Sequence, residues 1–317
     1  MKKGINFMIR EILSNNLYLK YTIKSIQRNR ILKKMEKKSI DELMEYDAAL
    51  YKDRQGYELD WNNLRTYSEK MQWEKLFDKD KRKVVCADKY CVREWVKDKI
   101  GEEYLIPLLG VWDCAKDIDF SKLPDQFVLK TNCGSGDVVI VRDKSKIAKR
   151  DIRGYRKKLE YFLNMKFGFN TCELHYNAIK PKIIAEKFIE CNDTDLPDYK
   201  FLCFNGKPYF CWVDIDRYHG HKRNVYNMNW ELQGWHQFNY GISKEKIKKP
   251  ENFEKMIEIA TILSTGFPHV RVDLYNLEGK IFFGEMTFTN SSGFEPIEPK
   301  SADYMLGELW TVDTTKR

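Results

Sequence analysis

His269-Val-Arg-Val-Asp-Leu-Tyr-Asn-Leu-Glu-Gly-Lys-Ile-Phe-Phe-Gly-Glu-Met-Thr287 predicts a β-hairpin, because two runs of β-favouring residues flank a turn at 276–279. A three-residue loop at 278–280 places Asp273 directly opposite Glu285. Side chains alternate along a strand, so Arg271 and Thr287 then share that face. The other face carries apolar side chains and Gly284: Val270, Val272, Leu274, Phe282, Met286 and Phe288. One face is therefore expected to be core, while the other presents two carboxylates, a guanidinium and a hydroxyl.

The polar face of this hairpin has two interpretations. Its oxygen atoms suit Mg²⁺, which takes one or two carboxylates and completes its shell with water and phosphate. The same side chains would also form a solvated ion-pair network between Arg271, Asp273 and Glu285. The hairpin alone leaves both interpretations open.

The composition is typical of a globular protein with room for two compact units, with 317 residues, 43% hydrophobic and 32% charged. No apolar run approaches the ~20 residues that a membrane helix needs, and the N-terminus lacks the pattern of a signal peptide. Eight scattered cysteines form no Cys-x-x-Cys pair. We therefore expect a cytoplasmic protein with reduced thiols, without disulfides or a zinc site.

Positive charge is concentrated near the N-terminus. Residues 1–38 contain eleven Lys or Arg and two Glu, a net charge of +9, which leaves −1 for the rest of a chain whose total is +8. Apolar residues are interspersed with this charge: Phe7, Met8, Ile12, Leu17, Tyr21 and Ile23. Such a basic arm would make a peripheral contact at the inner face of the plasma membrane, or form a solvated helix with one side on the body. Nucleic acid is not expected, because no recognition motif accompanies the charge.

The order of predicted elements indicates an α+β fold with mainly antiparallel sheets. Helical patterns cover 5–50 and 68–77, and a further helix is expected to begin with Asp88 as its N-cap and to end at Gly101. Strands are expected at 126–131, 138–142 and 181–189. Asn205-Gly206 predicts a second hairpin between 199–204 and 208–213.

A glycine-containing loop, Gly134-Ser135-Gly136, joins the strands at 126–131 and 138–142. Glycines let a backbone approach phosphate closely, and successive loop N–H groups form an anion nest. Lys130 supplies a point charge suited to phosphate oxygens. An ordinary hairpin with a surface lysine is the alternative. Lys89 adds a cation at the expected start of a helix, where the dipole disfavours cations unless an anion binds there.

Taken in order, these features resemble the ATP-grasp superfamily, and more narrowly the TupA-like ATP-grasp proteins associated with bacterial teichuronopeptide and capsular polysaccharide biosynthesis. The resemblance covers roughly residues 60–310. It depends on four segments: Ala87-Asp-Lys-Tyr-Cys-Val-Arg-Glu94, Leu123-Pro-Asp-Gln-Phe-Val-Leu-Lys-Thr-Asn132, Asp198-Tyr-Lys-Phe-Leu-Cys-Phe-Asn-Gly-Lys207, and Arg271-Val-Asp-Leu-Tyr275 with Phe283-Gly-Glu-Met-Thr-Phe288.

The resemblance implies a helical N-terminal region with the basic arm at 1–86, an ATP-grasp N-terminal lobe with the glycine loop at 87–190, and a C-terminal lobe with the metal-binding hairpin at 191–317.

The resemblance also implies which residues bind ATP and Mg²⁺. Lys89 and Lys130 hold the α- and β-phosphates, Gly134, Ser135 and Gly136 cover the phosphates, and Lys200 makes a further phosphate contact. Glu186, Lys187 and Ile189 hold the adenine edge, Asp273, Glu285 and Thr287 bind metal, and Arg271 acts with Lys130 in catalysis.

Two departures from the family pattern stand out. Many ATP-grasp ligases have Glu-x-Asn as metal ligands, whereas this chain has Glu285-Met-Thr287, so the hydroxyl or Asn290 would have to take the place of the asparagine. The usual Rossmann-like domain before the grasp is replaced by a short helical region.

By resemblance, the expected activity is an ATP-dependent carboxylate–amine ligase acting through an acyl phosphate on a small-molecule or glycan-precursor substrate, including a lipid-linked one. The alternatives are a kinase of the same glycan pathway and an assembly protein that has lost catalysis. A glycosyltransferase label also accompanies this family, but neither Asp193-Thr-Asp195 nor Asp214-Ile-Asp216 follows a strand in a Rossmann context.

Overall fold

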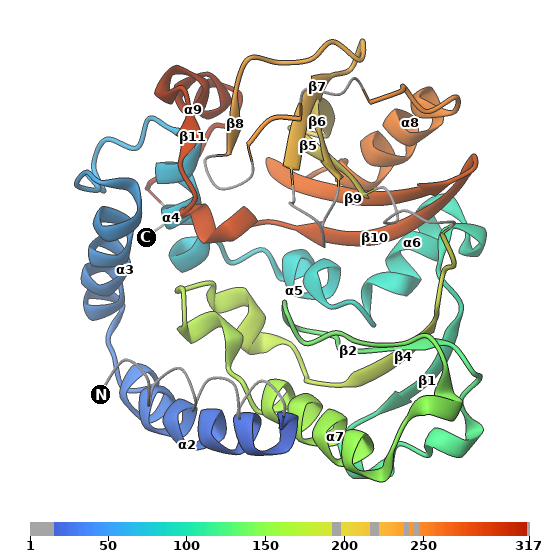
Figure 1. Cartoon of the computed structure of the whole chain (residues 1–317). Helices are drawn as coiled ribbons and strands as arrows, with labels where there is room; N and C mark the ends of the chain where they lie inside the picture. The colour runs from blue at the N-terminus through green and yellow to red at the C-terminus, as the bar shows by residue number, and fades with distance from the viewer. Residues whose placement is uncertain (1–15, 192–197, 216–221, 238–240, 244–246, 316–317) are drawn as a thin grey trace, which may run out of the picture.

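A computed structural model describes residues 16–191, 198–215, 222–237, 241–243 and 247–315 (Figure 1). The first fifteen residues of the predicted basic arm, the Asp193-Thr-Asp195 segment, and Asp216 lie outside these ranges. No helix in the described part of the chain is both long and apolar enough to cross a membrane.

Four helices make up most of the region before the first sheet: α2 (Leu17–Met35), α3 (Ile40–Gln55), α4 (Tyr67–Phe77) and α5 (Lys81–Ala87). α3 begins with a capping box in which Ser39 and Glu42 satisfy each other's backbone N–H groups, and α4 repeats it with Thr66 and Glu69. Gly56 ends α3 at φ 82°, a left-handed conformation that glycine adopts without steric cost.

α6 (Val92–Ile100) begins later than the sequence pattern predicts. The Asp88 carboxylate accepts the N–H groups of Tyr90 and Cys91, which makes it the cap of a turn between α5 and α6. Lys89 is therefore a turn residue, and its own N–H donates to the carbonyl of Asn132 at 2.9 Å. This bond fixes Lys89 against the end of a strand of the first sheet.

The first sheet has four antiparallel strands in the order β1-β4-β2-β3, formed by β1 (Leu108–Trp112), β2 (Phe127–Thr131), β3 (Val139–Val141) and β4 (Ile183–Lys187). α7 (Lys149–Leu163) covers one face of it, and Leu159 and Leu163 pack with Phe127, Leu129 and Ile183 in one apolar cluster. α2 lies along the outer side of α7 (Figure 1).

The second sheet has five antiparallel strands in the order β10-β9-β5-β6-β7. They are β5 (Asp198–Phe204), β6 (Lys207–Ile215), β7 (Lys222–Asn227), β9 (His269–Leu277) and β10 (Lys280–Thr287). α8 (Phe253–Ser264) packs on one face, while α4 and α9 (Lys300–Glu308) pack on part of the other. A short pair, β8 (His236–Gln237) with β11 (Ile297–Glu298), completes the strands described. The antiparallel α+β fold is confirmed.

The β9–β10 hairpin reaches the expected register by a different route. Asp273 lies opposite Glu285 as predicted, but Leu277 pairs with Lys280, so the turn has two residues rather than three. A bulge at Gly284 restores the register by adding one residue to β10. The assignment of Phe282 to the core face was therefore wrong, because Phe283 lies opposite Leu274.

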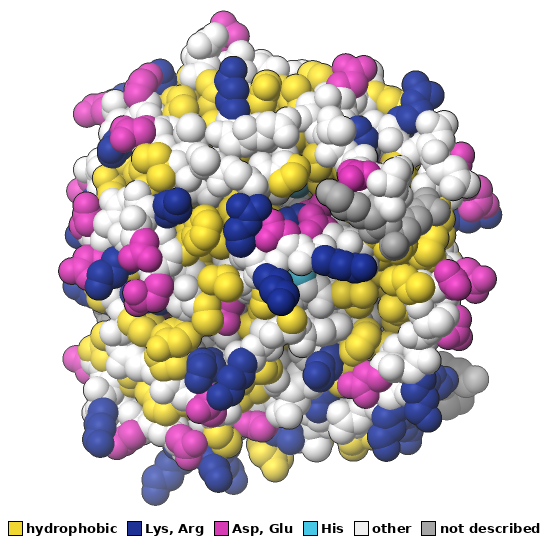
Figure 2. All heavy atoms as spheres, turned by 180° about the vertical axis from the view of Figure 1, so that it is seen from behind, with side chains coloured by type: hydrophobic (Ala, Val, Ile, Leu, Met, Phe, Trp, Pro, Cys, Tyr) yellow, Lys and Arg dark blue, Asp and Glu magenta, His cyan; other side chains and the backbone are white. Residues whose placement is uncertain are grey.

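The N-terminal helix α4 and the five-stranded sheet share an apolar core. Tyr67 and Met71 of α4 pack with Leu202 and Trp212 of the five-stranded sheet and with Trp310. The predicted domain limits at 86 and 190 stay predictions. Lys and Arg side chains gather toward the lower edge of the face in Figure 2, the end of the molecule formed by α2 and α7.

Candidate active site

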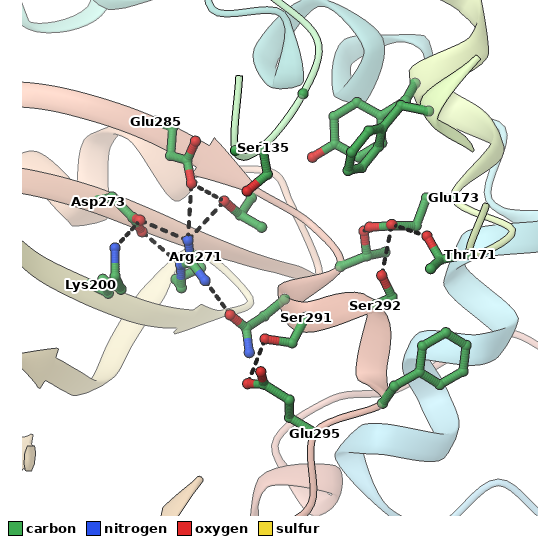
Figure 3. Close-up of a pocket in the computed structure, with 18 of the residues that line it drawn as sticks. Ser135, Thr171, Glu173, Lys200, Arg271, Asp273, Glu285, Ser291, Ser292 and Glu295 are labelled. Carbon is green, nitrogen blue, oxygen red and sulfur yellow. Dashed lines mark hydrogen bonds and ion pairs between the residues drawn. The ribbon is translucent and has the colours of Figure 1, made fainter. Parts of the chain in front are cut away.

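A cavity of about 990 Å³ is lined by residues of both sheets and of the N-terminal helices. It contains these residues predicted from the sequence: Lys89, Lys130, Gly134, Ser135, Gly136, Lys200, Arg271, Asp273, Glu285 and Thr287. Glu186, Lys187 and Ile189, expected to hold an adenine, are not among its lining residues. Figure 3 shows a charged cluster at one end of the cavity and a group of hydroxyls around Glu173 at the other.

A row of charged side chains crosses one face of the five-stranded sheet. Glu285 of β10 pairs with Asp273 of β9, and Asp273 pairs with Lys200 of β5. On the far strands, Asp214 of β6 pairs with Arg223 of β7. Paired residues of neighbouring strands share a face, so the register alone brings these groups together. The same face is apolar farther along, where α4 and α9 cover it.

Asp273 is the centre of this row and is only 2% exposed. Arg271 donates to both of its oxygens, from Nε and from Nη2, each at 2.7 Å. Lys200 Nζ donates to Asp273 at 2.7 Å and to Asp198 at 2.6 Å. Burial works against the charge of Arg271, but Asp273 outweighs burial and raises the pKa of the guanidinium above its ordinary value. The Arg271 guanidinium is therefore charged and held in place by paired hydrogen bonds, while burial raises the pKa of the Asp273 carboxyl.

Glu285 reaches farther into the cavity, with 35% of its side chain exposed. One oxygen accepts hydrogen bonds from Arg271 and Thr287, both at 3.1 Å, and the other lies 3.4 Å from Lys89 Nζ. Burial would raise the pKa of Glu285, but Lys89 and then Arg271 outweigh it and hold the pKa well below its usual range. Burial likewise opposes the charge of Lys89, and Glu285 reverses that effect, so the pKa of the lysine is raised.

Lys130 enters the cavity from the four-stranded sheet. Its Nζ lies 2.6 Å from Glu186, whose other oxygen lies 3.5 Å from Arg93. The Glu186 carboxylate thus orients Lys130. The N–H of Lys187 donates to the carbonyl of Pro107 at 2.9 Å, so this backbone donor of the predicted adenine hinge is already bonded within the sheet.

The glycine loop is connected to the hairpin through Lys89. Lys89 Nζ donates to the carbonyl of Gly134 at 2.8 Å while it faces Glu285. At the base of the loop, the buried carboxylate of Asp137 accepts both the N–H and the hydroxyl of Thr131. Gly136 has φ +79° with open space around it, so glycine is needed there for backbone conformation rather than for room.

A second end of the cavity is built around Glu173, which is 4% exposed. Its carboxylate accepts hydrogen bonds from the hydroxyls of Thr171, Thr289 and Ser292, the last at 2.8 Å. No ion pair of Glu173 occurs within the described residues. A buried carboxylate without a cation must be satisfied by hydrogen bonds, and three hydroxyls provide them here.

Three consecutive left-handed residues form the floor of this end. Ser291, Ser292 and Gly293 have φ of 46°, 55° and 69°. Such a conformation costs about 1–3 kcal/mol for each residue other than glycine and persists only where the surroundings hold it. The N-terminal helices do so: Gln55 of α3 donates to the Gly293 carbonyl at 3.1 Å, and Lys75 of α4 donates to the Ser292 carbonyl at 3.1 Å.

The donor chemistry at the hairpin fits Mg²⁺. Asp273, Glu285 and Thr287 offer only oxygens, on neighbouring strands and on one face. No cluster of three or more His, Cys, Asp or Glu suited to a metal occurs among the described residues, so phosphate and water oxygens would have to complete the shell. Asn290 is also present: its carbonyl oxygen accepts from Arg271, while its amide nitrogen is buried without a partner.

Sequence reasoning missed several residues of this cavity. Asp198 lies two positions before Lys200 in the same strand, so period-2 alternation could have placed it on the charged face. Glu173 and the turn at 291–293 gave no comparable signal. Glu173 lies at the start of a short 3₁₀ helix, and it meets Thr289 and Ser292 only through tertiary packing.

Comparison with solved structures gives several matches at low identity. D-alanine–D-alanine ligase from Bacillus anthracis matches with a TM-score of 0.43 and 17% identity, covering 78% of this chain and 73% of that chain. The enzyme of the same name from Helicobacter pylori matches with a TM-score of 0.39 and 12% identity, covering 71% and 59%. D-cycloserine synthetase DcsG matches with a TM-score of 0.37 and 12% identity, covering 71% and 69%.

Sequence comparison is more specific. No curated protein matches this chain in sequence. The family model described as TupA-like ATPgrasp matches residues 69–311, which include both sheets and every residue of the charged row. The chain therefore belongs to the TupA-like ATPgrasp family.

Proposed function

We propose that this protein is an ATP-dependent carboxylate–amine ligase of bacterial cell-surface polysaccharide biosynthesis. The observation that carries the proposal is a single cavity with a cationic, phosphate-compatible end and a separate hydroxyl-lined end. The family match supports the use of ATP. The pathway is supported by the resemblance to proteins of teichuronopeptide and capsule synthesis.

The cationic end would hold the triphosphate. Lys89 and Lys130 would pair with phosphate oxygens, and Lys89 would exchange its contact with the Gly134 carbonyl for one with phosphate. The exposed Ser135 at the loop tip would cover the phosphates. Arg271 is already charged and held by two hydrogen bonds to Asp273, so it would face the transferring phosphoryl group without reorganising.

Mg²⁺ would be held by Asp273 and Glu285, with the Thr287 hydroxyl as a weaker donor. When bound, it would neutralise charge on the phosphates and orient the γ-phosphoryl group. Around it, Lys200 and Arg271 keep Asp273 in place through three hydrogen bonds, so the carboxylate is positioned by protein contacts as well.

The reaction would take place in two steps. A substrate carboxylate oxygen attacks the γ-phosphorus, the bond to the bridging oxygen of ADP breaks, and an acyl phosphate forms. An amine nitrogen then attacks the carbonyl carbon, phosphate leaves, and the amine loses a proton to give the amide.

Glu173 lies at the end of the cavity away from the charged row and could accept a hydrogen bond from the amine. Burial and then the Glu173 carboxylate raise the pKa of Tyr176 well above its ordinary value, so this phenol in the cavity wall stays a hydrogen-bond donor.

Three measurements test the proposal. Calorimetry should show Mg-ATP binding, and ADP release should depend on addition of a uronic acid or an amino acid from a carboxylate panel. Hydroxylamine should convert the acyl phosphate to a hydroxamate. ADP release with a phosphorylated sugar and no hydroxamate would identify a kinase instead. Absence of Mg-ATP binding would support the assembly-protein alternative.

A further inference from the structure

α2 presents an apolar surface to solvent. The opposite side of the helix packs on α7, where the Tyr21 ring lies 5.3 Å from that of Tyr161 and Arg28 donates to the Tyr161 carbonyl at 2.7 Å. Gly154 of α7 permits the close approach, because a Cβ there would lie 2.9 Å from Leu17. These contacts fix which side of α2 faces outward.

The outward side begins with a row of apolar residues. Leu19, Ile23 and Ile26 are 39%, 36% and 56% exposed, and their spacing of four and three residues places them on one face of the helix. Continuing the same spacing, Arg30 and Lys33 extend this face, and both are exposed. A helix that only covers a protein surface normally has polar residues on its outward side. Further large apolar residues of α2, Tyr18 and Ile31, are 53% and 51% exposed.

The net charge of this part of the molecule is positive. α2 contains six Lys or Arg and no Asp or Glu, and α7 contains six Lys or Arg with two acids. Together they carry +10, whereas the whole chain carries +8, so all other residues sum to −2. The net positive charge is thus concentrated on two neighbouring helices of the described structure.

We propose that the outward face of α2 binds an anionic membrane surface, with Leu19, Ile23 and Ile26 entering the interface and the Lys and Arg side chains contacting lipid phosphates. Apolar and basic residues together on one helix face are the pattern of an interfacial helix. A symmetric contact with a second copy is disfavoured, because it would bring Arg30, Lys33 and Lys34 of one copy against the same basic residues of the other, and α2 contains no acid to pair with them. This surface is separate from the cavity, so it adds to the proposed ligase activity and does not depend on it.

Vesicle sedimentation tests the proposal with the full chain. The protein should sediment with vesicles of phosphatidylcholine mixed with phosphatidylglycerol and stay in solution with phosphatidylcholine alone. Combined Leu19→Ser, Ile23→Ser and Ile26→Ser substitutions should weaken binding at least about tenfold, as should combined Arg30→Gln, Lys33→Gln and Lys34→Gln substitutions. Val85→Ser with Leu232→Ser, which removes exposed apolar side chains elsewhere, should leave binding unchanged.

The variants change exposed positions, so their thermal unfolding should match that of the unchanged protein, and Mg-ATP binding should be retained. Equal sedimentation of all variants would overturn the proposal, because binding would then reside outside the α2 face. Absence of sedimentation with anionic vesicles would also overturn it. A dimer in solution that the serine substitutions dissociate, without vesicle binding, would assign the surface to a second copy instead.

Discussion

The two sheets present charge to the cavity in different ways. On the five-stranded sheet, Arg271 and Lys200 make three hydrogen bonds to one buried carboxylate, and each of the three residues is at most 7% exposed. On the four-stranded sheet, Lys130 makes a single ion pair at the cavity wall, beside a glycine loop whose tip is exposed. The first arrangement is rigid before any ligand binds, whereas the second can adjust to one. Substitutions in the two sheets should therefore affect stability and ligand binding in different proportions.

The largest effect is expected for Asp273→Asn, because it leaves buried Arg271 and Lys200 without their shared carboxylate. Removing one partner of a buried ion pair costs about 3–5 kcal/mol of unfolding free energy. ATP turnover should also fall by at least about 100-fold, since Arg271 loses its orientation and the metal loses a ligand. Urea unfolding and ADP release measure the two effects.

Asp113→Asn is the matched control, because the Asp113 side chain is 66% exposed and pairs with Lys182 on the surface. It should change stability by less than about 1 kcal/mol and leave turnover unchanged. Full ATP-dependent turnover by Asp273→Asn would show that the metal assignment is wrong.

Lys130→Met should reduce ATP binding more than it reduces stability, in contrast to the stability loss expected for Asp273→Asn. Glu186 loses its 2.6 Å partner but keeps Arg93 at 3.5 Å, so the unfolding free energy should fall by about 1–3 kcal/mol, less than in Asp273→Asn. ATP affinity should fall by about tenfold or more, because a charged hydrogen bond to phosphate contributes about 1.5–3 kcal/mol. Calorimetry with Mg-ATP measures the change, and Lys182→Met, outside the cavity, is the control. Equal affinity in the two variants would remove Lys130 from the phosphate site.

In the β9–β10 hairpin, the sequence predicted the faces of the strands correctly but not the length of the turn. Period-2 alternation correctly placed Arg271, Asp273, Glu285 and Thr287 on one face, because that rule is local. The alternation rule could not determine the number of residues in the turn. A two-residue turn with a bulge and a three-residue turn without one give the same pairing at Asp273. The signal of the bulge was Gly284, the one residue that interrupted the apolar face.

The contacts of the four-stranded sheet and of the far end of the cavity were less predictable for a different reason. The motif order led to the correct family, but the pairing of Lys130 with Glu186 joins residues of two strands brought together by the sheet. Glu173 likewise depends on hydroxyls more than one hundred residues away. Such contacts follow from tertiary packing, which no single-sequence periodicity encodes.

Gly284→Ala tests the bulge directly. A Cβ at this position would lie 3.1 Å from the carbonyl oxygen of Asp273, so the backbone next to Glu285 must move by a few tenths of an ångström to accept it. We expect a loss of about 1–2 kcal/mol in unfolding free energy and a higher Mg²⁺ requirement for turnover. Gly234→Ala, where nothing lies within 4 Å, should change neither. An unchanged Mg²⁺ requirement in Gly284→Ala would separate the bulge from the metal site.

The smallest expected effect concerns pH and the first residue of β9. His269 is fully buried, its Nε2 lies 3.0 Å from the Tyr67 hydroxyl and its Nδ1 lies 3.1 Å from the Cys203 carbonyl. Burial lowers the pKa of His269 from 6.5 to about 3, and Lys83 and Arg271 act in the same direction.

Because the unfolded chain binds this proton near pH 6.5 and the folded protein does not, stability is retained above pH 6.5 and falls as the pH decreases toward 3. Between pH 7 and pH 6 this one histidine should reduce the unfolding free energy by about 0.7 kcal/mol. Urea unfolding of the unchanged protein and of His269→Gln at both pH values isolates that difference. The variant should lose about 0.7 kcal/mol less than the unchanged protein over this interval, and identical losses would mean that His269 binds its proton equally well in the folded and unfolded states. In that case a cation would lie at the end of β9, two residues from Arg271, at pH values below about 6.5, and the charged row would then begin in the core rather than at the cavity.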